Sequence, residues 1–324
     1  MTPDTAFMLL ENLDLFWLLA AFAGGILGAM VGANYAFGFT GVSIIIGFGA
    51  LAGTGSTTIL DYVAFGPVFG PHIAFAGGVA AAAYAGRKGL LEGGGKDINT
   101  PLAGLGRPDV LLVAGAFGVG GYILQRLITH IPWFGAHTDS VALTVFTSAI
   151  VVRLVFGSTP VLHAPTRPDD KVFWLPWQQT PGQILTVSLG ASLMAAGAAT
   201  MIASYIVPMG QDIETYGQIV ANAQTIPFAF SALCIFAVAS GLKMPVTHHM
   251  TIIAGLSAIS FLTVSGSGLV ALLLGTCFGI ITAFVCEWVA RAFQNHGDTH
   301  IDPPAGSIWL MTTVLHLVLL PVAG

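Results

Sequence analysis

Long apolar runs separated by short polar segments occupy nearly all of the 324 residues of the chain. A hydropathy window of about 19 residues identifies segments that can cross a bilayer as helices. It predicts spans at 15–35, 39–51, 57–85, 109–131, 141–156, 184–206, 226–240, 247–264, 269–293 and 307–322. The pattern therefore predicts an all-α integral membrane protein with about 10 transmembrane helices, or about 11 if the third span, which contains two Gly-Pro pairs, is split in two.

The composition supports this class. Hydrophobic residues make up 55% of the chain and charged residues 8%, with a mean hydropathy of +0.84, whereas soluble domains average about 25% charged residues. The net charge of -5 offers no basic surface for nucleic acid. We expect the lipid bilayer and a small solute or ion as partners, and the Gly-rich helix faces fit tight packing within the bundle or in a homo-oligomer.

Charged loops predict the orientation. Arg87, Lys88, Lys96 and Arg107 precede one span, and Arg153, Arg167 and Lys171 precede another; the positive-inside rule places both loops in the cytoplasm. The acidic N-terminus, which lacks the basic region of a signal peptide, and the segment with Asp212 and Glu214 then lie outside. We expect a multi-pass protein of a prokaryotic cytoplasmic (inner) membrane. The side of the 294–305 loop, which has no Lys or Arg, is left open.

Short motifs recur in the two ends of the chain, which predicts an internal repeat. Residues 95–101 resemble 298–304, residues 39–40 resemble 246–247, and residues 53–56 resemble 265–268. We therefore expect one membrane domain, 1–324, with a first repeat at about 15–131, connecting spans at about 132–206 and a second repeat at about 226–322. Whether the repeats are parallel or inverted is left open. Duplicated halves with interrupted spans are typical of transporters whose site lies between the halves.

The stretch from Gly53 to His72 is the first candidate site, because it combines two Gly-Pro breaks with a lone acid, Asp61. An ionisable residue at membrane depth is a functional hypothesis by default. We predict an ion or substrate pathway lined by Asp61 and by residues of both halves, namely Asn34, Ser56, Thr57, Tyr62, His72, Thr247, His248, His249, Ser265 and Ser267. The alternative for Asp61 is a carboxyl group held near the membrane surface by Ser56 or Thr57 as a helix cap.

Histidines supply a second hypothesis. His248 and His249 are adjacent, so on a helix their rings point about 100° apart; we expect one to face the cavity and the other solvent. His296, Asp298, His300 and Asp302 alternate along the chain and in an extended segment would share one side, which is compatible with a divalent metal. The alternative is that Asp302, followed by Pro303, caps a helix.

The remaining charged and cysteine side chains favour structural roles. Glu287 and Arg291 are spaced to pair along a helix, while Arg126 and Arg153 are near enough to span ends to reach the membrane surface. Cys234, Cys277 and Cys286 lie in apolar runs without CxxC spacing, which is typical of buried hydrophobic positions.

These observations predict a membrane transporter for a small polar solute or ion, coupled to a proton or cation through Asp61, with no cofactor. A channel of the same architecture is one alternative. A membrane-embedded, metal-dependent enzyme using His248, His249 and the 296–302 cluster is another, and a non-catalytic membrane subunit is a third. No phosphate-binding, hydrolase or metalloprotease motif occurs in a suitable context.

Overall fold

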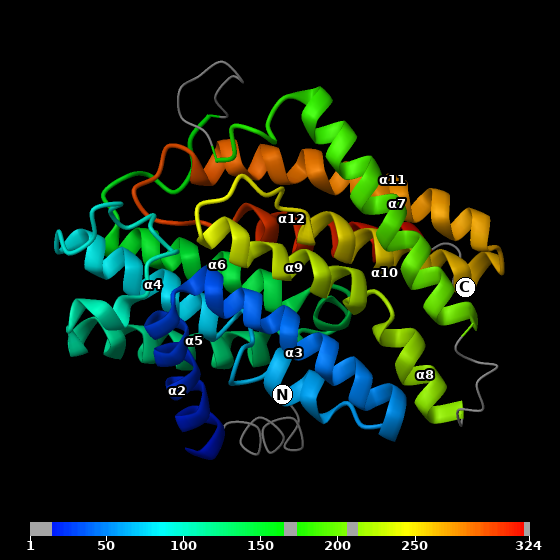
Figure 1. Ribbon diagram of the computed structural model, residues 1–324, viewed down its shortest axis with the longest axis horizontal. Helices are drawn as coiled ribbons and strands as arrows, with labels where there is room; N and C mark the ends of the chain where they lie inside the picture. The colour runs from blue at the N-terminus through cyan, green and yellow to red at the C-terminus, as the bar shows by residue number, and fades with distance from the viewer. Residues whose placement is uncertain (1–14, 165–173, 206–212, 321–324) are drawn as a thin grey trace.

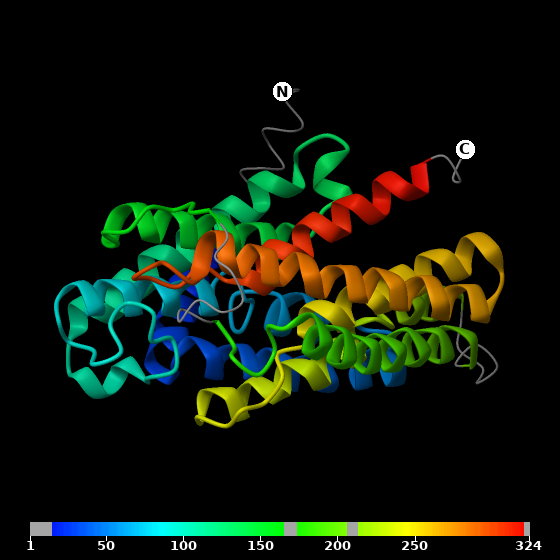
Figure 2. The same cartoon turned by 90° about the horizontal axis from the view of Figure 1, so that it is seen from above.

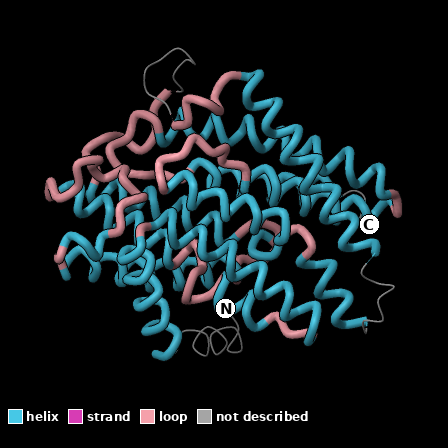
Figure 3. The backbone as a smooth tube through the Cα atoms, in the orientation of Figure 1, coloured by secondary structure: helices cyan, strands magenta, loops and turns pink. Residues whose placement is uncertain are grey.

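A computed structural model describes residues 15–164, 174–205 and 213–320. Within these residues the chain is helical, with loops gathered mainly at one end (Figure 3). An isolated parallel bridge joins Gly95 to Thr299. The predicted all-helical class is thus confirmed for the described residues. The acidic N-terminus (residues 1–14), Arg167, Lys171 and Asp212, which were used to predict the orientation, lie outside them.

Eleven labelled α-helices form the bundle in the described ranges (Figure 1). They are α2 (Leu15–Val31), α3 (Ala33–Thr54), α4 (Ala74–Arg87), α5 (Pro108–Thr129), α6 (Ser140–Phe156), α7 (Pro181–Tyr205), α8 (Ile213–Asn222), α9 (Thr225–Ala239), α10 (His248–Ser265), α11 (Gly268–Val289) and α12 (Pro303–Leu319). Short turns add η1 (Leu60–Ala64), η2 (Leu102–Leu105), η3 (Phe134–Ala136) and η5 (Ala290–Gln294).

Five helices are long and apolar enough to cross a membrane: α3, α5, α7, α10 and α11 with its extension η5. A sixth is obtained if α8 and α9, which meet at a bend of 42°, form one span. Helices α2, α6 and α12 are apolar but shorter, at 17 residues each. The structure therefore supports a membrane protein with several spanning helices, and the ten-span arrangement stays a prediction.

The first span ends earlier than predicted, whereas the third is interrupted as predicted. The first span was predicted to continue to residue 35, but α2 ends at Val31 and α3 begins at Ala33, because Gly32 adopts a positive φ of 94° that interrupts the helix. The interruption predicted in the third span is present. After Gly55, also at positive φ, the π-helical turn η1 is followed by turns through residues 65–73 before α4 begins.

The bundle contains two groups of three helices. Helices α2, α4 and α5 pack together, and α7, α10 and α11 pack together. Glycine permits the close approach within the first group, since a Cβ at Gly28 of α2 would overlap the carbonyl group of Ala74 at the start of α4. Between the groups, α3 packs against α9, and α6 packs against α12. The interface between the groups is thus formed by these two helix pairs.

The two helices of each interface pair run in opposite directions. Along the long axis of the molecule, α3 runs towards the end where α10 finishes, and α9 runs away from it (Figure 1). Helices α6 and α12 are likewise antiparallel, and α11 runs opposite to α5, as the second view confirms (Figure 2).

Polar loops are tied together at one end of the bundle, where Arg153 is the central residue. Its side chain was predicted to reach the membrane surface, but it is only 1% exposed. It turns inward because three acceptors hold it there: Nε donates to Thr299 Oγ1 at 2.6 Å, Nη2 to the Thr299 carbonyl at 2.7 Å and Nη1 to the Pro160 carbonyl at 3.1 Å. Arg153 thereby joins the end of α6 to the loop before α12.

Two further charged groups strengthen this junction. Burial would raise the pKa of Asp298, but hydrogen bonds from Ser158 and Thr159 outweigh it and hold the pKa well below its ordinary value of 3.8. Lys96 Nζ donates to the carbonyl groups of Gln294 and Asn295 at 2.8 and 3.1 Å. Burial, with the nearby positive charge of Arg153, lowers the pKa of Lys96 from 10.5 to about 8. Loops of the two ends of the chain therefore form one polar junction.

Candidate functional site

A cavity with a volume of about 290 Å³ lies between the two helix groups. Its wall is mainly apolar and is formed by α3, α6, α9, α10, α12, the end of α8, the start of α4 and the irregular segment before α4. The residues lining it are Asn34, Phe37, Phe65, Pro71, Phe75, Asp139, Val141, Ala142, Val145, Asn222, Gln224, Thr225, Phe228, Ile235, His248, Ile252, Asp302, Ala305 and Ile308. We call this space the central cavity.

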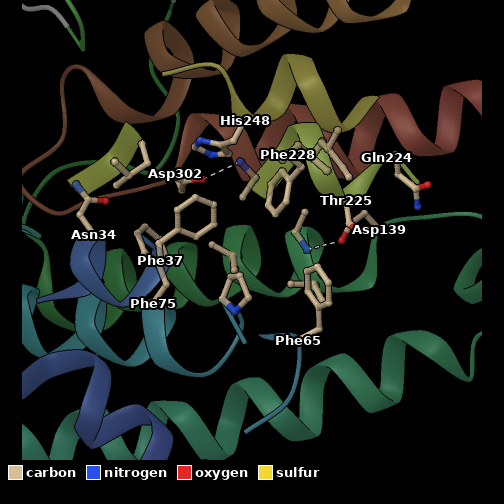
Figure 4. Close-up of a pocket in the computed structure, with 18 of the residues that line it drawn as sticks. Asn34, Phe37, Phe65, Phe75, Asp139, Gln224, Thr225, Phe228, His248 and Asp302 are labelled. Carbon is tan, nitrogen blue, oxygen red and sulfur yellow. Dashed lines mark hydrogen bonds between the residues drawn. The ribbon is translucent and has the colours of Figure 1, made fainter. Parts of the chain in front are cut away.

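A carboxyl group stands at each end of the central cavity (Figure 4). Asp139 is the N-cap of α6, and its Oδ1 accepts the amide hydrogen of Ala142 at 2.8 Å. Asp302 is the N-cap of α12, and its Oδ2 accepts the amide hydrogen of Ala305 at 2.8 Å. The predicted cap at Asp302, with Pro303 in the first turn, is confirmed. Since α6 and α12 are antiparallel, the two carboxyl groups face opposite ends of one space.

Aromatic side chains fill the middle of the cavity wall. The ring of Phe37 lies 6.0 Å from the rings of both Phe75 and Phe228. It also lies 4.7 Å from the imidazole of His248. Phe37 comes from α3 and Phe228 from α9, so each helix of this interface pair contributes one ring (Figure 4). These rings separate the Asp302 end from the Asp139 end.

At the Asp302 end the central cavity adjoins a second cavity of about 230 Å³. Asn34, His248 and Asp302 line both cavities, and Lys96 and His300 line the second. His300 Nε2 lies 3.2 Å from Asp302 Oδ1. Because the second cavity includes the loop of Lys96, it leads from Asp302 towards the polar junction.

At the Asp139 end the neighbouring polar side chains are Thr225 and Gln224, from the bend between α8 and α9 (Figure 4). Thr225 donates its hydroxyl hydrogen to the Asn222 carbonyl at 2.7 Å. Gln224 donates from Nε2 to the Ala221 carbonyl, while its buried Oε1 has no hydrogen-bond partner among the described residues. Phe65 closes this end from the segment before α4.

Asp61, the acid on which the sequence prediction centred, lies outside both described cavities. It is exposed and accepts a hydrogen bond at 2.7 Å from Thr57 Oγ1, as in the capping alternative. Tyr62 is 47% exposed and stacks on Trp17, and Ser56 hydrogen-bonds to Thr58. The role of these residues in a pathway stays a prediction that their positions do not test.

Of the other predicted pathway residues, two line the central cavity and five do not. Asn34 and His248 line the central cavity. His249 was expected to face solvent if His248 faced the cavity, but it is 1% exposed, because its part of α10 is enclosed by other helices. Thr247 is buried and bonds to Ser231, and His72 is buried next to Pro71. Ser265 and Ser267 lie at the turn between α10 and α11 and do not line either cavity.

The four alternating residues proposed as metal ligands do not converge. Asp298 points to Ser158 and Thr159, His296 Nε2 lies 2.8 Å from the Pro160 carbonyl, and His300 pairs with Asp302. Among the described residues no group of three or more His, Cys, Asp or Glu side chains is placed to hold a metal ion. The predicted pair of Glu287 and Arg291 is present, with 2.6 Å between Oε1 and Nε.

Asp139 is the main site residue that was not predicted. Its position before the apolar run of α6 gave a cap signal, as Asp302 did before α12. A comparison of two motifs 163 residues apart (302 minus 139) would have indicated that Asp139 corresponds to Asp302. The motifs are His137, Thr138, Asp139 and Ala142 in the first and His300, Ile301, Asp302 and Ala305 in the second.

The fold and cavity define an all-helical protein with several apolar helices of membrane-spanning length around a central, largely apolar cavity. The chain belongs to DUF7973, a family of unknown function, whose model matches it twice, at residues 7–168 and 166–323. No curated protein and no solved structure matches the chain.

Proposed function

We propose that the protein is a membrane transporter that moves a small polar solute or ion through the central cavity. The observation that carries this proposal is the cavity itself, which lies between the two helix groups and has a carboxyl group at either end. Acids inside apolar bundles are costly, and they commonly mark substrate or ion pathways. Irregular backbone at residues 65–73 and 242–247 leads into the cavity-lining helices α4 and α10, as in transporter sites.

Internal duplication supports the proposal. The second family match begins 159 residues after the first (166 minus 7). At this offset α2 overlaps α7, α5 overlaps α11 and α6 overlaps α12. Matching the remaining helices in chain order then pairs α3 with α9 and α4 with α10, and leaves α8 unpaired. This pairing differs from the sequence-based pairing, in which residue 298 corresponded to residue 95, an offset of 203. Only the shorter offset makes the packing match, since α2, α4 and α5 then correspond to α7, α10 and α11.

The residues lining the cavity follow the same pairing. Asp139, Ala142 and Val145 correspond to Asp302, Ala305 and Ile308, with an offset of 163 in each case. In the same way Asn34 and Phe37 correspond to Thr225 and Phe228, with an offset of 191, and Pro71 and Phe75 correspond to His248 and Ile252, with an offset of 177. A site built from equivalent residues of two repeats lies on their approximate two-fold axis.

The repeats would have opposite orientations in the membrane. Each contains five successive elements if the interrupted segment 58–87 and the bent pair α8 and α9 are each one crossing, and an odd number inverts the second repeat. The antiparallel directions of α3 and α9 and of α6 and α12 agree with this arrangement (Figures 1 and 2). Inverted repeats around a midplane site are the architecture of many alternating-access carriers.

Cysteine accessibility tests the proposal without requiring a known substrate. Cys234, Cys277 and Cys286 are first replaced by alanine, and Ala142→Cys or Ala305→Cys is then introduced at one or the other end of the cavity. In oriented membrane vesicles we expect a membrane-impermeant thiol reagent to label residue 305 from the side of the polar junction and residue 142 from the opposite side.

Ala114→Cys is the matched control, because Ala114 is 0% exposed and lies outside both cavities. It should remain unlabelled from either side. A carrier would protect one cavity position while the other is labelled, whereas a channel would leave both open together. Labelling of residues 142 and 305 at no more than the rate of residue 114 would refute a transport pathway through the cavity.

A further inference from the structure

We infer that the central cavity binds an elongated organic dication, with one ammonium group at Asp139 and the other at Asp302. This inference rests on the proposed function and names the substrate class. Neither carboxyl group has a Lys or Arg ion-pair partner among the described residues, and His300 and His248 are ionisable neighbours of Asp302. A carboxylate in an apolar wall is stabilised by a positive charge placed against it.

The electrostatics of the cavity disfavour an anion. No Lys or Arg belongs to the described lining of the central cavity. The N-termini of α6 and α12, which could otherwise attract an anion, are already capped by Asp139 and Asp302. Each cap uses one carboxylate oxygen for a backbone amide, and a carboxylate can accept further hydrogen bonds from a ligand.

Unpartnered nitrogen and oxygen atoms also mark the two ends. His248 is 6% exposed and lines the cavity at the Asp302 end, and its Nδ1 has no hydrogen-bond partner among the described residues. At the Asp139 end, the buried Oε1 of Gln224 likewise has no hydrogen-bond partner among the described residues. Buried polar groups are normally hydrogen-bonded. Gln224 Oε1 can accept a hydrogen bond from an N–H group of the ligand, and His248 Nδ1 can accept one in the tautomer that carries its hydrogen on Nε2.

The wall between the two ends suits the body of such a ligand. Phe37, Phe75 and Phe228 offer aromatic faces, and Val145 and Ile308 offer aliphatic ones. Methylene groups are stabilised against such a surface, and an ammonium passing the rings is attracted to their faces. An apolar chain with a charge at each end therefore matches the cavity along its whole length.

The helix geometry sets the length of the ligand. Each of α6 and α12 lines the cavity over six residue steps, from Asp139 to Val145 and from Asp302 to Ile308, which corresponds to about 9 Å per helix at about 1.5 Å per residue. Because the helices are antiparallel, the separation of the two carboxyl groups depends on how far the two lining segments overlap: about 9 Å if they overlap fully and about 18 Å if they only meet end to end. Linear α,ω-diamines with four to eight carbons fall in the range that two ammonium–carboxylate contacts can bridge.

Calorimetric titration of the purified full chain in detergent at pH 7 tests the inference. The probes are 1,6-diaminohexane and its singly charged counterpart 1-aminohexane, followed by diamines with four and eight carbons. We expect the best diamine to bind at least tenfold more tightly than 1-aminohexane. Asp139→Asn and Asp302→Asn should each weaken diamine binding at least tenfold and remove the preference over the monoamine, while the helix caps persist because asparagine also caps helices.

Glu92→Gln is the control, since it removes an exposed carboxylate that lines neither cavity, and it should leave the affinity unchanged. The inference is overturned if no diamine binds to the folded protein, if monoamine and diamine bind equally, or if both cavity variants bind like wild type. If no diamine binds but residues 142 and 305 are labelled from opposite sides, the transport proposal holds and diamines are excluded as the substrate class. Diamine binding without such labelling would instead leave a binding site and exclude transport.

Discussion

Replacement of Arg153 by methionine should be among the most destabilising single changes in the polar junction. Met keeps the apolar stem but removes a guanidinium that is 1% exposed and donates to Thr299 and Pro160. The substitution leaves buried acceptors without donors, and it also removes the positive charge 3.8 Å from Asp298. Leaving a buried polar group without its hydrogen-bond partner costs about 1–3 kcal/mol, and three acceptors lose their donor here, so we expect Arg153→Met to lose about 3–5 kcal/mol of unfolding free energy.

Arg107→Met provides the comparison. Arg107 also pairs with an acid, Asp109, at 2.9 Å, but both side chains are more than a third exposed, and such pairs contribute little to stability. Unfolding by SDS titration, followed by circular dichroism in mixed micelles, measures both variants under one condition. Equal losses for the two variants, or a loss below about 1 kcal/mol for Arg153→Met, would refute the idea that the buried guanidinium holds the junction together.

Two further perturbations address the junction and the helix packing. Because the pKa of Lys96 is lowered to about 8, its folded state loses the proton before the unfolded state does, so stability relative to Lys96→Met should rise between about pH 8 and pH 10.5; a flat difference between the two pH profiles would contradict this. Gly28→Ala should destabilise by about 1–3 kcal/mol in the same titration, since its Cβ would overlap the Ala74 carbonyl. Gly49→Ala, whose Cβ meets nothing within 4 Å, should be neutral or slightly stabilising, and equal effects at the two glycines would contradict the close-packing argument.

Hydropathy predicted the helices well because burial in lipid or protein demands long apolar runs with internal hydrogen bonds. The break after Gly55 and the cap at Asp302 were also predictable, since glycine and proline chemistry acts locally. The turn at Gly32 was missed because the apolar pattern continues across it and hydropathy does not register a single positive φ. Arg153 was placed at the surface because a window cannot show that acceptors 146 residues further along the chain would enclose it.

The candidate site was harder to predict than the helices for a related reason. Asp61 stood out as an acid among apolar residues, whereas Asp139 and Asp302 look like ordinary helix caps in one dimension. Their shared cavity becomes visible only when α6 and α12 are placed side by side. Comparison of the motifs around residues 137–142 and 300–305 would have connected the two acids, but short motifs in Gly- and Ala-rich sequence also allow the other register.

The antiparallel pairing of α3 with α9 bears on how the gene could have arisen. If the halves descend from one short ancestor, two copies of that ancestor must have associated with opposite orientations in the membrane. Such a chain needs nearly balanced charges at its two ends, since a strong bias would force one orientation. In the present chain Lys96 and Arg153 lie close together at the polar junction. Fusion of the copies would have released each half from that balance and allowed the surplus of positive charge to accumulate at one end.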